Sequence, residues 1–221
     1  MVNPLPRNAV PVSIALDGRG VFLSGQNGAG KSTVLRTIGL NLVIGRAFGF
    51  CYAASASMSS APVYCSIQIE DSMNGGESLY MAELRRAREL LQASERDAGC
   101  VFLIDEIFRG TNQLDSVSAA AAVLHSLAQR SLLLVSSHNL VLSPLLERWL
   151  TPLRVERKAG SHDDMFLAPG ILVDPNGIAL LTSSGFNAEV ASKADKVSAW
   201  LSDYLSHPKE CPNLLDNSQV M

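Results

Sequence analysis

Apolar and polar positions follow two different rhythms along the chain. Short runs that are apolar throughout, such as residues 101–104 (VFLI) and 132–135 (LLLV), are bounded by charged or turn-forming residues. Longer stretches, such as residues 78–93, repeat Leu, Met and Ala at helical spacing among Glu and Arg. The first pattern predicts buried strands, and the second predicts amphipathic helices. Apolar strands separated by helices indicate a parallel sheet covered on both faces, which is an α/β sandwich.

The same patterns predict the order of elements. We expect strands at 21–24, 62–69, 101–104 and 132–136, and helices at 31–45, 78–93 and 116–129. Beyond Leu150 the pattern changes to short strand candidates separated by turns, at 153–155, 165–167 and 178–181, followed by a helix at 187–205. Residues 1–12 contain three prolines and read as an extended arm. One domain over residues 1–206 and a flexible tail over 207–221 are therefore predicted.

Composition narrows the class of protein. A chain of 221 residues that is 47% hydrophobic and 18% charged can bury the core of one domain. The net charge of −3 opposes a surface devoted to nucleic acid, because phosphate contacts need clustered cations. A local basic strip stays possible on one predicted helix, at Arg85, Arg86 and Arg88. A solvated helix face is the favoured interpretation of that strip.

The cysteines and the apolar stretches indicate in which cellular compartment the protein is expected. Four cysteines, at positions 51, 65, 100 and 211, show no metal-ligand spacing. They are predicted to be small core residues of a reduced, cytosolic protein. Prolines interrupt the amino terminus where an export signal needs an apolar core. The longest apolar region, 119–146, contains polar residues such as His125 and Arg130, so no membrane span is expected.

Residues 25–32 read GQNGAGKS, between a predicted strand and a predicted helix. They match G-x-x-x-x-G-K-[ST], whose glycines let backbone N–H groups surround a phosphate at the positive end of the helix. Lys31 is expected to reach the β and γ phosphates of ATP, Ser32 to ligate Mg²⁺, and Thr33 to lie near the α phosphate. The expected nucleotide-binding positions are Gly25, Gln26, Asn27, Gly28, Ala29, Gly30, Lys31, Ser32 and Thr33.

Two acids follow the apolar strand at 101–104. Asp105 is the expected Mg²⁺ partner, through water or Ser32, and Glu106 is placed to orient and deprotonate the attacking water. Loss of Glu106 is therefore expected to stop turnover without stopping binding. His138, after the strand at 132–136, is expected to contact the γ phosphate, because it follows the two acids by one helix and one strand. A structural role is the alternative for this histidine.

Three segments resemble a known family. They are DEIFRGTN (105–112), SSH (136–138) and GGESLYMAEL (75–84). In order and spacing they are similar to the carboxy-terminal ATPase domain of the MutS family of DNA mismatch repair proteins, which shows D-E-x-x-R-G-T, a downstream S-H or T-H, and an upstream S-x-x-x-x-E helix. The resemblance covers nearly the whole chain. It implies the three-layer sandwich of a P-loop NTPase, similar to transporter-type ATPases, with small antiparallel additions.

The resemblance also implies a partner. In such ATPases two domains meet head to tail, so the chain is expected to form a homodimer or heterodimer through its ATPase face. Ser78, at the start of its helix, would then face the γ phosphate held by the partner subunit. Arg109, Thr111 and Asn112 would lie on the loop that crosses the interface. DNA is the family's ligand, although the acidic balance predicts that this chain alone binds it weakly.

Several alternatives stay open at this stage. The family's phosphate loop usually reads close to GPNMGGKS, whereas Gln26, Gly28 and Ala29 make this loop more similar to those of transporter and chromosome-maintenance ATPases. An ATP-dependent dimerisation module without turnover, or a related ATPase without mismatch recognition, is therefore the alternative. A transporter ATPase is disfavoured because NGGES replaces LSGGQ. A small-molecule kinase is disfavoured because no lid or acceptor segment is visible. The chain can be a stand-alone protein or part of a longer one.

Overall fold

A computed structural model of the chain describes residues 1–6, 9–16, 18–67, 78–97, 99–157, 165–172, 184 and 188–205. Its elements are β1 (Gly20–Gly25), α1 (Lys31–Phe48), β2 (Val63–Ile67), α2 (Leu79–Arg96), β3 (Val101–Asp105), α3 (Gln113–Ala128), β4 (Leu132–Ser136), α4 (Leu142–Leu145), β5 (Leu150–Arg157), β6 (Met165–Pro169) and α6 (Ala188–Leu205). The predicted order of strands and helices is confirmed over the described residues. The strand candidate at 178–181 and the tail at 207–221 lie outside them.

The strands form one sheet in the order β2-β3-β4-β1-β5-β6. All pairings are parallel except that of β5 with β6. The α/β fold with a mainly parallel sheet is therefore confirmed. β5 is longer than the predicted strand at 153–155, and it pairs with β1 in the main sheet, so the antiparallel addition among the described strands consists of β6 alone. The four-residue helix α4 lies outside the predicted elements.

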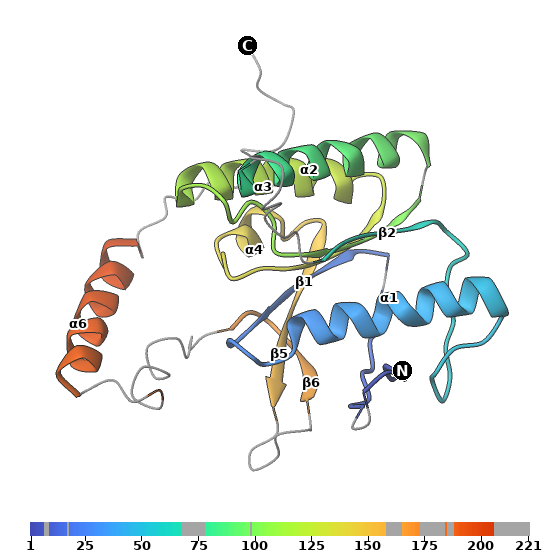
Figure 1. Cartoon of the computed structure of the whole chain (residues 1–221), viewed down its shortest axis with the longest axis horizontal. Coiled ribbons are helices and arrows are strands. Elements are labelled where there is room, and N and C mark those ends of the chain that lie inside the picture. Colours follow the sequence, from blue (N-terminus) through green and yellow to red (C-terminus); the bar gives the residue numbers. More distant parts are fainter. Residues whose placement is uncertain are drawn as a thin grey trace.

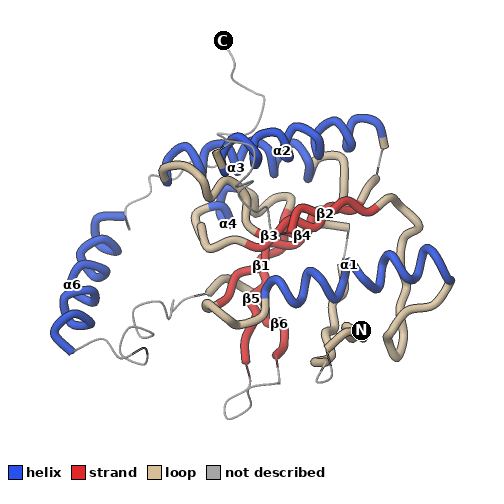
Figure 2. Tube along the Cα trace, viewed as in Figure 1, coloured by secondary structure: helices blue, strands red, loops and turns tan. Residues whose placement is uncertain are grey.

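Helices cover both faces of the sheet, with α1 on one side and α2 and α3 on the other (Figures 1 and 2). Successive side chains of each central strand point to opposite faces of the sheet and so pack against different helices. Phe22 and Phe102 pack in the layer of α2 and α3. Leu23 and Leu103 pack in the layer of α1. The final helix α6 stands apart from this sandwich (Figure 1).

The helix α1 begins directly after the predicted phosphate loop, residues 25–30, and ends at a glycine. Gly49 adopts φ 74°, and its N–H donates to the carbonyl of Gly45 at 3.0 Å. This left-handed cap favours glycine because it carries no Cβ. The helix therefore extends three residues beyond the predicted end, to Phe48.

The amino-terminal arm has no helix or strand in its described residues. The buried side chain of Asn41, on α1, fastens it: its Nδ2 donates to the carbonyl of Val2 at 2.8 Å, and its Oδ1 accepts from the N–H of Tyr52 at 2.7 Å. The N–H of Val12 donates to the carbonyl of Met1 at 2.8 Å. One buried amide thus joins the arm, α1 and the segment after α1.

The prediction that the cysteines are core residues is wrong in part. Cys100 is buried, but Cys51 is half-buried and Cys65 is exposed. The reason for Cys65 is that β2 lies at the edge of the sheet, where a strand is covered less well than a central one. Cys211 lies outside the described residues. Partial burial of the Cys65 thiol raises its pKa, and the nearby Arg86 opposes this shift.

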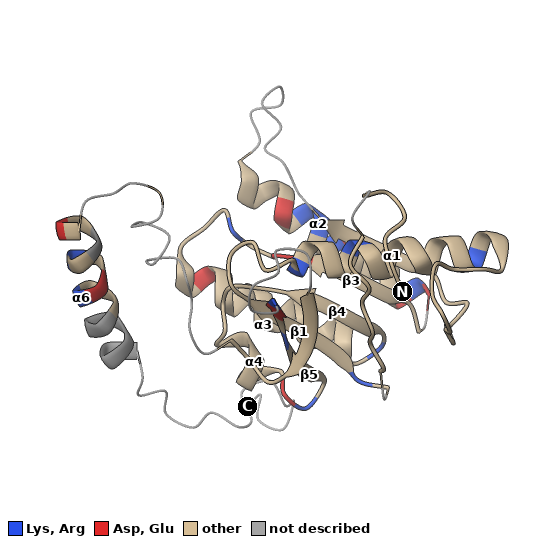
Figure 3. Cartoon of the chain, turned by 90° about the horizontal axis from the view of Figure 1, so that it is seen from below, with Lys and Arg blue, Asp and Glu red and all other residues tan. Residues whose placement is uncertain are grey.

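Basic residues are coloured blue along the ribbon of α2 in Figure 3. Arg85 and Arg88 are exposed. Arg86 donates to the carbonyl of Cys65 on the edge strand and forms an ion pair with Glu89 at 2.8 Å. Arg86 therefore has a structural role.

Among the described residues, no helix combines the length and apolarity needed to span a membrane.

Candidate nucleotide-binding site

The carboxyl ends of β1, β3 and β4 meet at one edge of the sheet, because these three strands are neighbours and parallel. This is where open α/β sheets bind ligands. A cavity of about 900 Å³ lies there. Its lining comprises Asn27, Gly28, Gly30, Lys31, Ser32, Thr33, Asp105, Glu106, Phe108, Arg109, Thr111, Gln113, Ser116, His138, Asn139 and Arg157. Most of the predicted site residues therefore come together. Gly25, Gln26, Ala29 and Ser78 do not line this cavity.

The phosphate loop has the backbone shape that its glycines predict. Gly28 and Gly30 adopt φ 75° and 109°, in the left-handed region that favours glycine. A Cβ on Gly30 would lie 2.8 Å from the sulfur of Met165, and around Gly28 the space is open. No side chain caps the start of α1. Its first N–H groups and its positive end are thus suited to an anion, and the residues fit a phosphate.

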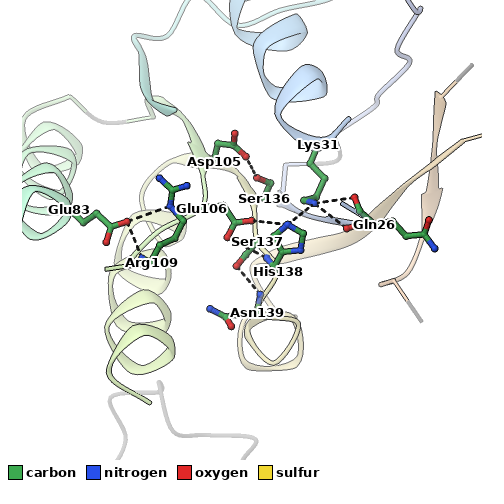
Figure 4. A network of polar contacts seen from close by, with 11 residues as sticks. Gln26, Lys31, Glu83, Asp105, Glu106, Arg109, Ser136, Ser137, His138 and Asn139 are labelled. Atoms are coloured by element: carbon green, nitrogen blue, oxygen red, sulfur yellow. Dashed lines mark hydrogen bonds and ion pairs between the residues drawn. The ribbon is translucent and has the colours of Figure 1, made fainter. Parts of the chain in front are cut away.

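The ammonium of Lys31 is buried inside the loop. Its Nζ donates to the carbonyls of Gly25 and Gln26 at 3.0 and 3.4 Å, and it lies 3.1 Å from Nε2 of His138 (Figure 4). Burial lowers the pKa of Lys31, and the nearby Glu106 and Asp105 oppose that shift. Burial, and then Lys31, lower the pKa of His138. A lowered pKa favours the neutral ring, in the tautomer whose Nε2 accepts from the ammonium.

The acid that ends β3, Asp105, is fixed by the neighbouring strand. Asp105 lies opposite Ser136 in the sheet, and Oγ of Ser136 donates to its Oδ1. Among the described residues, no group of three or more His, Cys, Asp or Glu could hold a metal by itself. Mg²⁺ needs no such cage, since it is commonly bound by one or two carboxylates together with substrate phosphates and water. Ser32 and Asp105 at the cavity wall fit a cation that arrives with phosphates.

Glu106 is a partly buried carboxylate, and one of its two oxygens accepts no hydrogen bond. Its side chain is 17% exposed, and its Oε2 accepts from the N–H of His138 at 3.4 Å. The other oxygen, Oε1, is buried without a hydrogen-bond partner, 3.7 Å from Nε2 of His138. Burial raises the pKa of Glu106, although the His138 N–H and Lys31 counteract it. A desolvated carboxylate with a free oxygen at a cavity is characteristic of a functional group.

Glu106 also begins an unusual loop, residues 106–110. Glu106 and Phe108 adopt φ 58° and 57°, and they are the described non-glycine residues with positive φ. Phe108 is 1% exposed, and its ring meets that of Tyr80 edge-on at 6.0 Å. At the far end of the loop, Glu83 of α2 accepts from the N–H groups of Arg109 and Gly110, each at 3.0 Å.

Sequence reasoning missed Phe108 and assigned no task to Glu83. Glu83 is the acid that ends the S-x-x-x-x-E pattern begun by Ser78, and it is also a charge on the buried stripe of α2 with Ala87 and Leu90. The left-handed conformation of Phe108 has no sequence signal.

The residues expected at a dimer interface have local roles in the single chain. Ser78 is exposed and caps α2, with Oγ accepting from the N–H of Met81 at 3.4 Å. Asn112 caps α3 by accepting from the N–H of Asp115 at 3.0 Å. Arg109 and Thr111 line the cavity. The preceding residues 75–76 lie outside the described ones, and the role of Ser78 toward a partner stays a prediction.

Comparison with known proteins shows which family the chain resembles. Residues 21–202 match the family model described as MutS domain V. The DNA mismatch repair protein MutS of Thermus aquaticus is 28% identical over 190 residues, covering 84% of this chain and 23% of that protein. A MutS protein of Thermus thermophilus is 30% identical over 191 residues, with the same coverage. Endonuclease MutS2 of Thermus thermophilus is 34% identical over 148 residues, covering 65% of this chain and 19% of that protein. The chain spans about a quarter or less of the length of these relatives.

Proposed function

The chain belongs to the MutS family, through its domain V, and from this premise we propose that it binds ATP with Mg²⁺ and hydrolyses it. The observation that carries the proposal is the free Oε1 of Glu106, buried at a cavity that the phosphate loop also lines. A cavity that only bound phosphate would have no use for a desolvated carboxylate, because the charge opposes an anion. A water molecule that attacks the γ phosphate needs such an acceptor for its proton.

Each residue then has a defined task. Lys31, which bonds to the carbonyls of its own loop and to His138, would transfer its hydrogen bonds to phosphate oxygens. Glu106 would accept a proton from the attacking water molecule. The oxygen of that water would bond to the γ phosphorus, and the bond between the γ phosphorus and the β–γ bridging oxygen would break. ADP and inorganic phosphate leave. His138 would orient the γ phosphate. When bound through Ser32 and Asp105, Mg²⁺ would neutralise phosphate charge.

We further propose that the chain works as a dimer in a DNA transaction of the MutS type. Two of the relatives are DNA mismatch repair proteins by name, and a third is named as an endonuclease. Ser78 is exposed at the start of an 18-residue helix, where a hydroxyl and the helix dipole favour a phosphate held by a second copy. With a net charge of −3, the chain alone is expected to bind duplex DNA weakly.

Two variants test the proposal. Lys31→Ala should abolish binding of a fluorescent ATP analogue, because it removes the cation inside the loop. Glu106→Gln should keep ATP affinity and lower phosphate release about 10²–10⁴-fold, the usual contribution of a general base. Glu147→Gln, an exposed acid outside the cavity, is the matched control and should resemble the wild type. Hydrolysis by Glu106→Gln at the wild-type rate would overturn the role of Glu106.

The dimer is tested separately. Glu106→Gln should accumulate a dimer at saturating ATP and Mg²⁺, measured by light scattering, because the variant binds without turning over. A monomer under those conditions would contradict the dimer and leave the ATPase proposal standing. Tight duplex binding by the chain alone at physiological salt would contradict the expectation for DNA.

A further inference from the structure

Glu83 is a carboxylate in a place that is costly for a charge. It is 1% exposed and lies on the buried stripe of α2. Its oxygens accept from two successive backbone N–H groups, those of Arg109 and Gly110, and Nε of Arg109 lies 3.9 Å from Oε1. A buried carboxylate is tolerated when hydrogen bonds and a nearby cation compensate for lost water. The partners of Glu83 belong to a single loop, which begins at Glu106.

That loop does not keep its shape through its own sequence. Glu106 and Phe108 have left-handed backbones, which non-glycine residues keep only where the surroundings impose them. The N–H of Glu106 donates to the carbonyl of Ser136 at 3.1 Å, which anchors the start of the loop on β4. Glu83 anchors its end. Between these two anchors, Phe108 is buried against Tyr80 of α2.

The approach of the loop to α2 is close. A Cβ on Gly110 would lie 2.6 Å from the backbone nitrogen of Tyr80 and 3.0 Å from its Cα. The first turn of α2 and the end of the loop are therefore in direct backbone contact. A change in how α2 holds Gly110 would be passed along a few residues to Glu106.

We propose that Glu83 is a positioning residue, whose carboxylate holds the backbone of Arg109 and Gly110 and thereby keeps Glu106 in its left-handed, cavity-facing conformation. Glu83 does not line the cavity, so it would not touch a nucleotide bound there. Its effect on hydrolysis rests on the function proposed above, whereas its effect on the loop does not. Figure 4 shows Glu83 and Arg109 together on one side of the site, with Glu106 between them and His138.

The test uses the whole chain with Glu83→Gln and Glu83→Ala. Gln keeps the size of the side chain and one carbonyl oxygen, but its NH₂ group faces an N–H that needs an acceptor. Ala removes both acceptors. Glu89→Gln is the matched control, because it changes an exposed acid of the same helix that forms a surface ion pair with Arg86.

Amide hydrogen exchange over residues 106–112 is the first measurement, without nucleotide. Glu83→Gln should speed exchange at Arg109 and Gly110 about tenfold or more and leave that of β1 and α1 unchanged, because local opening is governed by local bonds. Glu83→Ala should speed it further, and Glu89→Gln should not. Unchanged exchange in Glu83→Gln would overturn the proposal whether or not the protein hydrolyses ATP. If Glu83→Ala does not fold, Glu83→Gln still decides.

Steady-state kinetics are the second measurement. Glu83→Gln should lower kcat about tenfold while the Kd for ATP changes less than about twofold, because the phosphate loop is untouched. Faster exchange with an unchanged kcat would show that the loop is held but Glu106 is not positioned, and would overturn the proposal. Absence of hydrolysis in the wild type would instead contradict the proposed function. The exchange experiment would still test whether Glu83 stabilises the backbone of Arg109 and Gly110.

Discussion

Two loops at the same edge of the sheet reach their shapes by opposite means. The loop after β1 places its left-handed backbones on Gly28 and Gly30, where they have little steric cost. The loop after β3 places them on Glu106 and Phe108, where they are unfavourable. The first loop relies mainly on glycine, with one added contact in which Arg157 of β5 donates to the carbonyl of Gly28 at 2.5 Å, and the second relies on contacts with α2 and β4.

This difference suits the two tasks that we propose. A loop that binds phosphate through its backbone benefits from glycines, because they adopt left-handed conformations at little steric cost. A loop that carries the base can be made to depend on a neighbouring element, since its conformation lasts only while the contacts to Ser136, Tyr80 and Glu83 persist. If this is so, substitutions at the contacts of the second loop should act on that loop and spare the first.

The largest effect is expected from Phe108→Ala. Removal of a fully buried ring should lower the free energy of unfolding by about 3–5 kcal/mol, because a cavity is left against Tyr80. Denaturant unfolding measures it. Phe166→Ala, at a ring that is 48% exposed on β6, is the control and should change stability by less than about 0.5 kcal/mol. Equal losses in the two variants would mean that the loop does not rely on the Phe108 contact.

Smaller losses of stability are expected from Gly110→Ala and Gly28→Ala, and the two variants should differ in which functional property they lower. A methyl at Gly110 meets the backbone of Tyr80, which cannot move aside cheaply, so about 1–3 kcal/mol of stability should be lost. For a chain of this size that is about 2–4 °C in Tm per kcal/mol.

Gly28→Ala has open space around the methyl and costs only the left-handed backbone, about 1–2 kcal/mol. The two variants should also differ in function: Gly110→Ala should lower kcat at unchanged ATP affinity, and Gly28→Ala should lower the affinity. Loss of affinity in Gly110→Ala would erase the distinction between the loops.

The smallest effect concerns the charge of Glu106. Its folded-state pKa is raised by burial, so the folded protein binds more protons than the unfolded chain between the ordinary value of about 4.3 and the raised one. Stability therefore falls as pH rises through that window. Glu106→Gln should be more stable than the wild type at pH 7, and should lose this advantage once the pH falls below the ordinary pKa of a glutamate, where the carboxyl is protonated in both the folded and the unfolded chain.

Thermal unfolding at several pH values measures the effect, with exposed Glu147→Gln as the control. A stability difference that is the same at all pH values would indicate a cause other than the charge of Glu106.

Much of the fold and part of the site could be predicted from the sequence. The strands and the phosphate loop have local signals, because burial on both faces makes a strand apolar throughout and a left-handed turn favours glycine. The proximity of Asp105, Glu106 and His138 follows from parallel strand ends. The roles of these residues stay predictions, and the structure brings them to one cavity.

The remainder depends on contacts between distant segments. The exposure of Cys65 follows from the strand order, which places β2 at the edge. The left-handed backbone of Phe108 and the hold of Glu83 on Gly110 arise only when α2 packs against the loop. No local pattern of residues encodes such contacts.

The amide of Asn41 ties the amino-terminal arm to the helix that begins at the candidate nucleotide site. Asn41 stands ten residues after Lys31, the first residue of α1, and its Nδ2 donates to the carbonyl of Val2. At a rise of 1.5 Å per residue, that separation along the helix is about 15 Å. The arm and the site therefore share one helix as their support.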